Sequence, residues 1–498
     1  MTRHKSNIET FQITKHTRRY DKRTGKFIIN INYRTAPPKP TKRVITVAEA
    51  FGLGLDTQQK FIIYDNIQLK IAPTDITYLT GDSGSGKSTL LKTLKKDITK
   101  SMHQTTIDIT DIKPDENKPI IETIGKTIQQ SLELLSRVGL NDAFLFLRRY
   151  KQLSDGQRYR YRIAKMIESN AQFWIMDEFC STLDRDTAKI VAHNVQKLAR
   201  QHRKAVLAAT THTDLFKDLQ PSVHIHKKFG KEIQVHYHSD QPHKPCSLLQ
   251  QIHIDKGTKT DYQTLAEFHY RSHNVGAVRK IFRATRNDDR ELCGVIVYTY
   301  PPIATSGRRK TLPKMPISQL NQTLSNIMRV VVHPKYRTIG LGQKLVHETL
   351  DKCGTQYVET TAVMARYNPF FEKAGMTKIQ ETTPPKQALQ IQETLTKLGF
   401  NTTLLSSQKH VITQLKHLTQ TETATIKQAF AQNTHPRFAK EFFPHQPYGK
   451  HKQYREKTET ASLEKLAKLI HITAMLLQTK AYLFWRRTAP SPHNRSVR

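Results

Sequence analysis

The sequence predicts an α/β protein of several domains, and this prediction rests on two loop motifs and on the length of the chain. Residues 81–88 and 337–342 both contain glycines, and each joins a short apolar run to a stretch with helical spacing. Such a loop between a strand and a helix suits phosphate, because backbone N–H groups and the helix dipole both face the anion. With 498 residues and roughly 150 per domain, we expect about three domains.

The charge of the chain indicates a polyanionic partner. The sequence has 79 Lys and Arg against 42 Asp and Glu, which gives a formal net charge of +37. A field of this sign attracts nucleic acid, and we expect RNA more than DNA. A solvated basic surface and binding to an anionic membrane surface are the alternatives.

The cysteines and the hydropathy pattern predict a cytoplasmic protein. Cys180, Cys246, Cys293 and Cys353 have no CxxC spacing, which argues against a disulfide framework and against a cysteine zinc site. The basic start of the chain is not followed by an apolar segment, so no secretory signal is predicted. No apolar run is long enough to cross a bilayer, and we expect no integral membrane segment.

Breaks in composition divide the chain into four predicted parts. They are a basic N-terminal extension, an α/β domain of alternating strands and helices, a second α/β domain, and a helical C-terminal region that completes or packs on the second domain. In the last part, apolar residues at helical spacing predict a helix from Ser462 to Arg487. The four parts are residues 1–45, 46–240, 250–380 and 386–498.

The N-terminal extension has its own local pattern. A turn is predicted around residues 20–25, followed by a strand at 27–32. Prolines at 37, 38 and 40 end this segment.

The first motif reads Gly-Asp-Ser-Gly-Ser-Gly-Lys-Ser and matches the Walker A pattern. The strand 76–80 leads into it and a helix follows. Lys87 is expected to reach the β- and γ-phosphates of ATP and Ser88 to bind Mg²⁺, while the glycines let the backbone wrap the phosphates. The predicted nucleotide-binding residues in this segment are Gly81, Ser83, Gly84, Gly86, Lys87, Ser88 and Thr89.

Two carboxylates, Asp177 and Glu178, follow the apolar run 173–176. We predict that Asp177 holds the metal together with Ser88, and that Glu178 is the catalytic group that polarises the attacking water. On its own, such a pair is usually a solvated strand end.

Three further motifs follow in a fixed order: Leu-Ser-Asp-Gly-Gln at 153–157, Ser-Thr-Leu-Asp at 181–184, and His212. In these residues the chain resembles the ABC-type ATPases. The resemblance implies ATP and Mg²⁺ as ligands and a head-to-tail homodimer, in which one subunit caps the γ-phosphate held by the other. It makes His212 the switch histidine at that phosphate. The residues implied to cap the phosphate are Ser154, Gly156 and Gln157.

Some positions depart from the ABC pattern. Asp155 stands where glycine is commoner, and no glutamine marks the metal-sensing loop, for which Glu116 and Asn117 are the candidates. Because neither membrane spans nor a permease docking region can be recognised, members of the superfamily that act on DNA, RNA or ribosomes are a better comparison than transporters. The adenine-stacking aromatic remains open among Phe51, Phe61 and Tyr64.

The second motif, at 337–342, reads Arg-Thr-Ile-Gly-Leu-Gly, and residues 368–375 read Asn-Pro-Phe-Phe-Glu-Lys-Ala-Gly. A strand at 326–333 precedes the motif, and a helix at 343–350 and a strand at 356–364 follow it. Together these features resemble the GNAT acetyltransferases over about residues 250–380. The resemblance implies acetyl-CoA as a cofactor, with its pyrophosphate on Arg337, Gly340 and Gly342.

Both blocks together resemble a family of ABC-type ATPases fused to a predicted acetyltransferase, over most of the chain. The resemblance implies direct transfer of acetyl to an amine, with a β-strand amide polarising the thioester carbonyl. Phe371 stands where many GNAT members carry the tyrosine that protonates the leaving thiolate. Tyr367 is the predicted replacement, unless the thiolate leaves unaided.

Other residues of this region have two interpretations each. Glu359 and Glu372 are candidate general bases, with an ordinary structural carboxylate as the alternative for each. The basic loop 308–310 suits a phosphate-rich acceptor, while a solvated loop or a contact with the CoA 3′-phosphate explains it as well.

Four histidines, His224, His226, His236 and His238, alternate on the two sides of a turn. A hairpin would place them on one face, where zinc could bind. We favour a structural role, because no acidic ligands accompany them.

The leading hypothesis is an ATP-dependent N-acetyltransferase whose acceptor is a nucleic acid. It combines the two predicted loops with the large positive charge. The alternatives are acetylation of an amine on a nucleic-acid-bound protein, and a non-catalytic ATP-driven nucleic-acid clamp that only senses acetyl-CoA.

Overall fold

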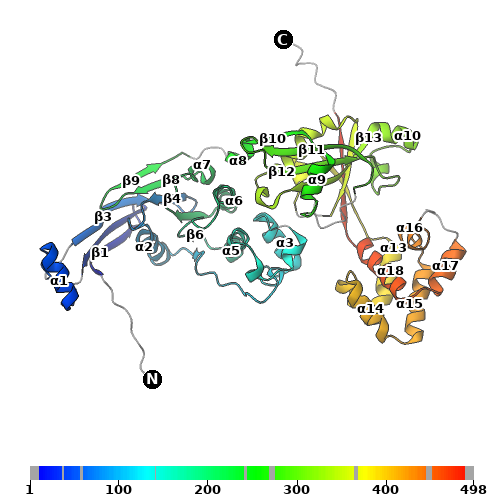
Figure 1. The fold of residues 1–498 in the computed structure, drawn as a ribbon, viewed down its shortest axis with the longest axis horizontal. Helices are drawn as coiled ribbons and strands as arrows, with labels where there is room; N and C mark the ends of the chain where they lie inside the picture. Colours follow the sequence, from blue (N-terminus) through cyan, green and yellow to red (C-terminus); the bar gives the residue numbers. More distant parts are fainter. Residues whose placement is uncertain are drawn as a thin grey trace, which may run out of the picture. The chain divides into compact units, whose positions relative to one another are not determined.

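A computed structural model describes residues 11–35, 39–55, 60–140, 142–239, 244–268, 275–363, 368–444 and 451–487. The described chain forms two compact units, and Figure 1 labels their elements. Residues 329–348, from the predicted acyltransferase part, belong to the same unit as the predicted ATPase part, so the units differ from the predicted division. Unit 1 consists of the chain up to Gly276, Lys280–Val297 and Arg329–Glu348, and unit 2 of Ala277–Arg279, Tyr298–Met328 and the chain from Thr349.

The main sheet of unit 1 has six strands. They are, in spatial order, β5 (Thr106–Asp108), β6 (Phe173–Met176), β7 (Ala205–Ala209), β4 (Ile76–Gly81), β8 (Val223–Lys227) and β9 (Ile233–Tyr237). All neighbours are parallel except β8 and β9. Every residue of β4, β6 and β7 is buried, as expected for a parallel sheet covered on both faces.

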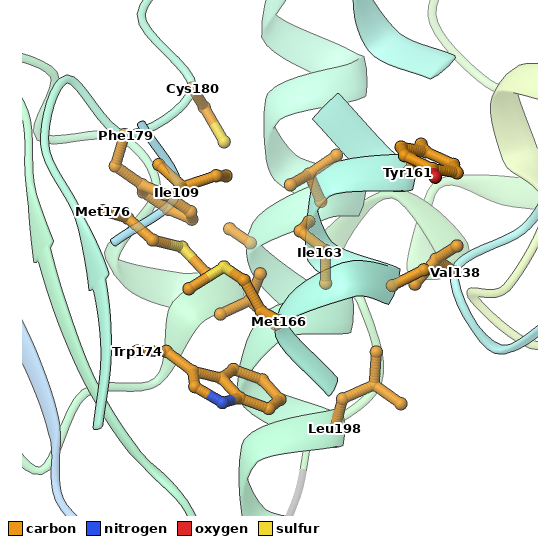
Figure 2. Packing of buried hydrophobic residues seen from close by; sticks show 14 of the residues in the cluster. Ile109, Val138, Tyr161, Ile163, Met166, Trp174, Met176, Phe179, Cys180 and Leu198 are labelled. Atoms are coloured by element: carbon orange, nitrogen blue, oxygen red, sulfur yellow. The ribbon is translucent and has the colours of Figure 1, made fainter. Parts of the chain in front are cut away.

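Helices from α2 to α7 bury apolar side chains in two clusters that they share with the strands of this sheet. Figure 2 shows the thioethers of Met166 and Met176 turned toward each other beside the indole ring of Trp174, and all three side chains are buried. This packing fixes α5, which carries Met166, against β6. In the described chain up to Gly276, the helices are α1 (Lys42–Phe51), α2 (Lys87–Lys100), α3 (Ile128–Arg137), α4 (Ala143–Phe146), α5 (Asp155–Ser169), α6 (Arg185–His202), α7 (Phe216–Leu219), α8 (Ser247–Gln250) and α9 (Lys259–Ala266).

The predicted N-terminal extension is part of the core of unit 1. Strands β1 (Phe11–Asp21), β2 (Lys26–Thr35) and β3 (Lys60–Lys70) form an antiparallel sheet, with the predicted turn between β1 and β2. Alternate residues of β2 are fully buried and belong to the same apolar cluster as residues of α2. The positive charge of the segment concealed this period-two pattern. The buried β2 residues are Phe27, Ile29 and Ile31.

A second sheet has seven strands in the order β10-β11-β12-β13-β14-β16-β15. Its inner neighbours β13 and β14 are parallel, and β16 is antiparallel to both β14 and β15. The strands are β10 (Ile252–Lys256), β11 (Val278–Arg286), β12 (Leu292–Thr299), β13 (Leu324–Val332), β14 (Tyr357–Ala362), β15 (Thr377–Thr382) and β16 (Lys480–Arg486). The associated helices are α10 (Ile317–Thr323), α11 (Leu341–Thr349) and α12 (Phe370–Lys373).

In the described parts of the segment between β15 and β16, six α-helices share one apolar core. The helix predicted from Ser462 to Arg487 is too long: Ser462 caps α18, which ends at Leu476, and residues 480–486 form β16. Four consecutive residues of β16 are buried, a pattern that an inner strand and a buried helix share. The helices are α13 (Lys386–Lys397), α14 (Gln408–His417), α15 (Gln420–Gln432), α16 (Pro436–Phe442), α17 (His451–Glu459) and α18 (Leu463–Leu476).

Candidate functional site

The loop at 81–86 joins β4 to α2, as the sequence predicts. Lys87, the first residue of α2, donates from Nζ to the carbonyl oxygens of Gly81 at 2.8 Å and Asp82 at 2.6 Å. Burial lowers the pKa of Lys87, and the carboxylates of Asp177 and Asp82 oppose this shift. The ammonium group therefore lies inside the loop, close to the carboxylate at the end of β6.

Gly86 is required by the shape of this loop. Its φ is +100°, and a Cβ at this position would lie 2.5 Å from Cγ2 of Ile63. Tyr64 is fully buried and donates its hydroxyl to the Gly86 carbonyl at 2.9 Å. Tyr64 therefore supports the loop and cannot stack on adenine, so the exposed Phe51 and Phe61 remain as candidates.

The predicted pair of carboxylates lies at the carboxyl end of β6. Asp177 Oδ1 accepts a 3.0 Å hydrogen bond from the backbone N–H of Glu178, which fixes the Asp177 side chain beside the strand end. Glu178 is exposed and has a φ of +50°. The N–H of Phe179, the next residue, donates to the carbonyl of Ala209 in β7 at 2.7 Å, so the turn stays against the end of the neighbouring strand.

The predicted signature residues lie at the N-terminus of α5. Ser154 Oγ accepts from the N–H of Gln157 at 3.4 Å, and Gln157 Oε1 accepts from the N–H of Ser154 at 3.1 Å. This capping box fixes the helix start, where unpaired N–H groups and the helix dipole favour an anion. A Cβ at Gly156 would lie 3.3 Å from Cγ2 of Thr187, so α5 and α6 approach closely here. Asp155 is exposed and pairs with Arg158.

The remaining motifs of the first unit lie near the same strand ends. Asp184 caps α6 by accepting from the N–H of Thr187 at 3.0 Å. The carbonyl of His212 accepts the hydroxyl of Tyr78, a residue of β4. His212 therefore lies beside the strand that leads into the phosphate loop. Glu116 and Asn117 are both exposed, and nothing in their geometry selects one as the metal sensor.

The second loop follows η4 (Pro334–Tyr336) and leads into α11. The side chain of Arg337 is only 10% exposed, and it donates to the carbonyls of Val332 at 3.3 Å and Phe268 at 3.4 Å. Burial lowers the pKa of Arg337. The guanidinium group also pairs with Asp142 at 3.8 Å, so its contacts hold the loop from inside and do not support the predicted role at a pyrophosphate. Backbone N–H groups at the start of α11 remain as the anion-binding candidates.

Helices α5 and α6 contact this loop within unit 1. Arg160 of α5 donates from both terminal nitrogens to the carbonyls of residues 334 and 335, each at 3.3 Å. Lys197 of α6 donates to the carbonyl of Thr338 at 3.2 Å, and Asn194 donates to the Thr338 hydroxyl. Arg160 is 6% and Asn194 4% exposed, so these polar side chains are committed to the contact.

Asp186, in the first turn of α6, adds an ion pair to the same contact. It accepts from Lys335 at 2.7 Å and from Arg286 at 2.6 Å. Burial raises the pKa of Asp186, but the hydrogen bonds from these two cations outweigh it, so the pKa is lowered. The carboxylate is therefore charged at neutral pH.

Glu359, a predicted general base, lies fully buried in unit 2 in an ion pair. Its carboxylate accepts from Arg308 at 2.5 and 3.0 Å, from Tyr482 at 3.0 Å and from Thr305 at 3.3 Å. Four donors fill the lone-pair positions of a carboxylate. This arrangement argues against Glu359 as a base, and it removes Arg308 from the acceptor-binding loop, where Arg309 and Lys310 are exposed.

Of the other residues considered for acyl transfer, the structure describes Phe371 and Glu372. Tyr367 lies outside the described residues. Phe371 is buried and stacks on Phe370, with ring centroids 4.1 Å apart. Glu372 has a buried Oε2 without a hydrogen-bond partner in the described chain, so it remains the better candidate base.

The β8–β9 hairpin pairs His224 with His236, as predicted. Thr80 Oγ1 lies 2.9 Å from Nε2 of His224 and 3.0 Å from Nδ1 of His226. Burial and the neighbouring histidines lower the pKa of His224 to about 4. These contacts to a threonine of β4 agree with the structural role that we favoured for the histidines.

The sequence did not reveal the contact between the second loop and α5 and α6. Its only local signal is a polar residue at a buried helix position, as at Arg160 and Asn194. Such a residue predicts a partner but does not name it.

The glycine-rich loop bonds its own lysine, and carboxylates lie at a nearby strand end. These features define a P-loop nucleotide-binding domain. A family model described as ABC transporter matches residues 64–142. The alpha-hemolysin translocation ATP-binding protein HlyB of Escherichia coli O157:H7 is 28% identical over 182 residues, which cover 30% of this chain and 25% of that protein. The methionine import ATP-binding protein MetN 1 of Oenococcus oeni is 27% identical over 228 residues, 39% of this chain and 64% of that protein.

One solved structure matches part of this chain. The dimeric structure of the bacterial ABC transporter cassette MJ0796 is 17% identical, covers 36% of this chain and 92% of that chain, and has a TM-score of 0.30. The chain contains an ABC-type ATP-binding domain. It spans about a quarter of the hemolysin translocation protein. In the described ranges, no helix combines the length and the apolar character needed to cross a bilayer.

Proposed function

We propose that this chain is an ATP-hydrolysing ABC-type ATPase coupled to an acetyl-CoA-dependent N-acetyltransferase, and that the acceptor is a nucleic acid, RNA more than DNA. The observation that carries the proposal is the contact of α5 and α6 with the loop at 334–338. It connects the helix that begins at the signature residues to the loop expected to hold CoA.

In the ATPase half, Lys87 supplies the phosphate-binding cation, and Ser88 and Asp177 are the residues that would hold Mg²⁺. The metal would neutralise charge on the phosphates when bound. Glu178, exposed at the strand end, orients the attacking water. The MJ0796 cassette forms a dimer, and we extend a head-to-tail dimer to this chain, with Ser154 and Gln157 facing the partner's nucleotide.

The acetyltransferase half rests on the second sheet and its loop. The ladder between β13 and β14 pairs Leu324–Asn326 with Tyr357–Glu359, and both strands continue past it. Backbone N–H groups beyond such a short parallel ladder are suited to polarise a thioester carbonyl. The loop after β13 opens into α11, whose N-terminus suits the diphosphate.

The geometry of α5 and α6 supports coupling between the two activities. Arg160 lies six residues after Ser154, which is about 9 Å along the helix. Asp186 lies in the first turn of α6, directly after the motif at 181–184. Closure of two subunits over ATP would therefore press on the ends of the same two helices that hold the acyl-CoA loop.

Charge supports a nucleic-acid acceptor. The chain carries +37, and exposed cations include Arg19, Lys22, Arg23, Arg309 and Lys310. Phosphate contacts of this kind give affinity and orientation but no sequence preference.

The test is incubation with labelled acetyl-CoA, ATP and total RNA or DNA, followed by analysis of the nucleosides. Wild type should label nucleic acid, Gly342→Arg should abolish labelling but keep ATP binding, and Lys87→Ala should lose ATP binding but keep acetyl-CoA binding. Label found only in protein would refute the nucleic-acid acceptor. Acetyl-CoA binding without any transfer would instead support the clamp.

A further inference from the structure

Three buried residues from separate segments meet in unit 1. They are His193 of α6, Asp218 of α7 and Cys246, which precedes α8. Their exposed fractions are 3%, 1% and 0%. Each offers one ligand atom, and the three atoms lie within 4.8 Å of one another. Among the described residues, no other group of three or more histidine, cysteine, aspartate or glutamate side chains lies close enough to share a cation.

We propose that His193, Asp218 and Cys246 form a structural zinc site. Imidazole nitrogen, thiolate sulfur and carboxylate oxygen are the three ligand types that zinc accepts. A zinc ion would balance the charge of a thiolate and a carboxylate in a place where neither has access to bulk solvent.

The surrounding contacts orient the carboxylate ligand. Asp218 accepts from the N–H of Ser247 at 2.8 Å and from its hydroxyl at 2.7 Å, so the carboxylate is held in place. Outer hydrogen bonds of this kind are the usual support of metal-binding carboxylates.

The chain supplies three ligands, and a tetrahedral zinc ion would need a fourth, which is not among these residues. The ion would join α6 and α7 to the start of α8, where the chain leaves the ATP-binding domain.

The test uses the full chain, purified without a histidine tag, and measures zinc by elemental analysis after equilibration with zinc and removal of the free ion. We expect about one zinc per chain in the wild type and a loss of at least about tenfold in Cys246→Ala. Two control variants, Cys353→Ala at another buried cysteine and His224→Asn in the histidine hairpin, should keep the ion.

A second measurement needs no variant. Cobalt bound in place of zinc should give the wild type the absorption of a cobalt-thiolate bond, so the result stands even if Cys246→Ala does not fold. A wild type that binds no stoichiometric zinc overturns the proposal and leaves a hydrogen-bonded cluster. Equal zinc in Cys246→Ala, or cobalt without the thiolate band, also overturns it.

Discussion

Removal of the Glu359 carboxylate should destabilise unit 2 strongly without removing the general base of the proposed acetyl transfer. The carboxylate is fully buried and accepts four hydrogen bonds, two of them from Arg308 at 2.5 and 3.0 Å. Glu359→Ala leaves the guanidinium of Arg308, which is 8% exposed, without a counter-ion. Breaking one side of a buried ion pair costs about 3–5 kcal/mol.

Hydrogen exchange is the suitable assay, because a chain of two units need not unfold in a single two-state transition. Peptides from β14 and β16, which pair directly, report the local opening. A loss of about 3–5 kcal/mol raises their opening constant by roughly two to three and a half orders of magnitude. The double variant Glu359→Leu/Arg308→Met should recover most of that protection, because an apolar pair can replace a buried ion pair.

Two results would refute this account. One is a change of less than about 1 kcal/mol in Glu359→Ala, the range of an exposed ion pair. The other is a Glu359→Gln variant in which the rate of acetyl transfer no longer falls on the acid side of its pH dependence. That result would identify Glu359 as the titrating base.

Four further predictions follow from the first unit and the charge. Gly86→Ala should lower ATP affinity by at least about tenfold, because its Cβ meets Ile63 and the φ of +100° is strained. Since the pKa of His224 is about 4 in the folded protein and 6.5 otherwise, unfolding binds a proton between these values and stability should fall as pH drops through that window. Arg160→Met should remove the ATP-dependent change in acetyl-CoA affinity measured by calorimetry, an expected coupling of about 1–3 kcal/mol. The log of the affinity for duplex DNA should fall by about 0.9 per contacted phosphate for each tenfold rise in salt.

Controls make these predictions decisive. Gly230→Ala has a similar φ of +76° but no atom within 4 Å of its Cβ, so it should leave ATP binding intact, and equal effects of both glycine variants would contradict the role of the clash. His224→Gln should reduce the loss of stability at acid pH. If the dependence of stability on pH is unchanged in this variant, other groups cause the loss. If ATP still changes the acetyl-CoA affinity of Arg160→Met, the contact of Arg160 with the second loop does not couple the two sites. If the affinity for duplex DNA does not change with salt, phosphate contacts do not provide the binding.

Local patterns were readable from the sequence because each of them needs only neighbouring residues. The Walker loop, the strand that ends just before Asp177 and the helix start at Ser154 all lie where the sequence predicts them. In each case a strand, a loop and a helix that follow one another in the chain build the feature.

Features that depend on distant partners were not readable. Glu359 binds Arg308 and Tyr482, which are 51 and 123 residues away, so nothing near Glu359 marks it as one member of an ion pair. Arg337 was expected at a pyrophosphate, yet buried carbonyls take its guanidinium. Residues 480–486 were assigned to a helix, because continuous apolar residues fit either a helix or an inner strand until the pairing is known.

The position of β16 has a consequence for biosynthesis. It lies between β14 and β15 although about a hundred residues separate it from β15 in the chain. While the polypeptide emerges from the ribosome, β14 and β15 must wait with unsatisfied edges until β16 is made. A premature stop shortly before Lys480 would thus remove an interior strand and expose two open edges to aggregation.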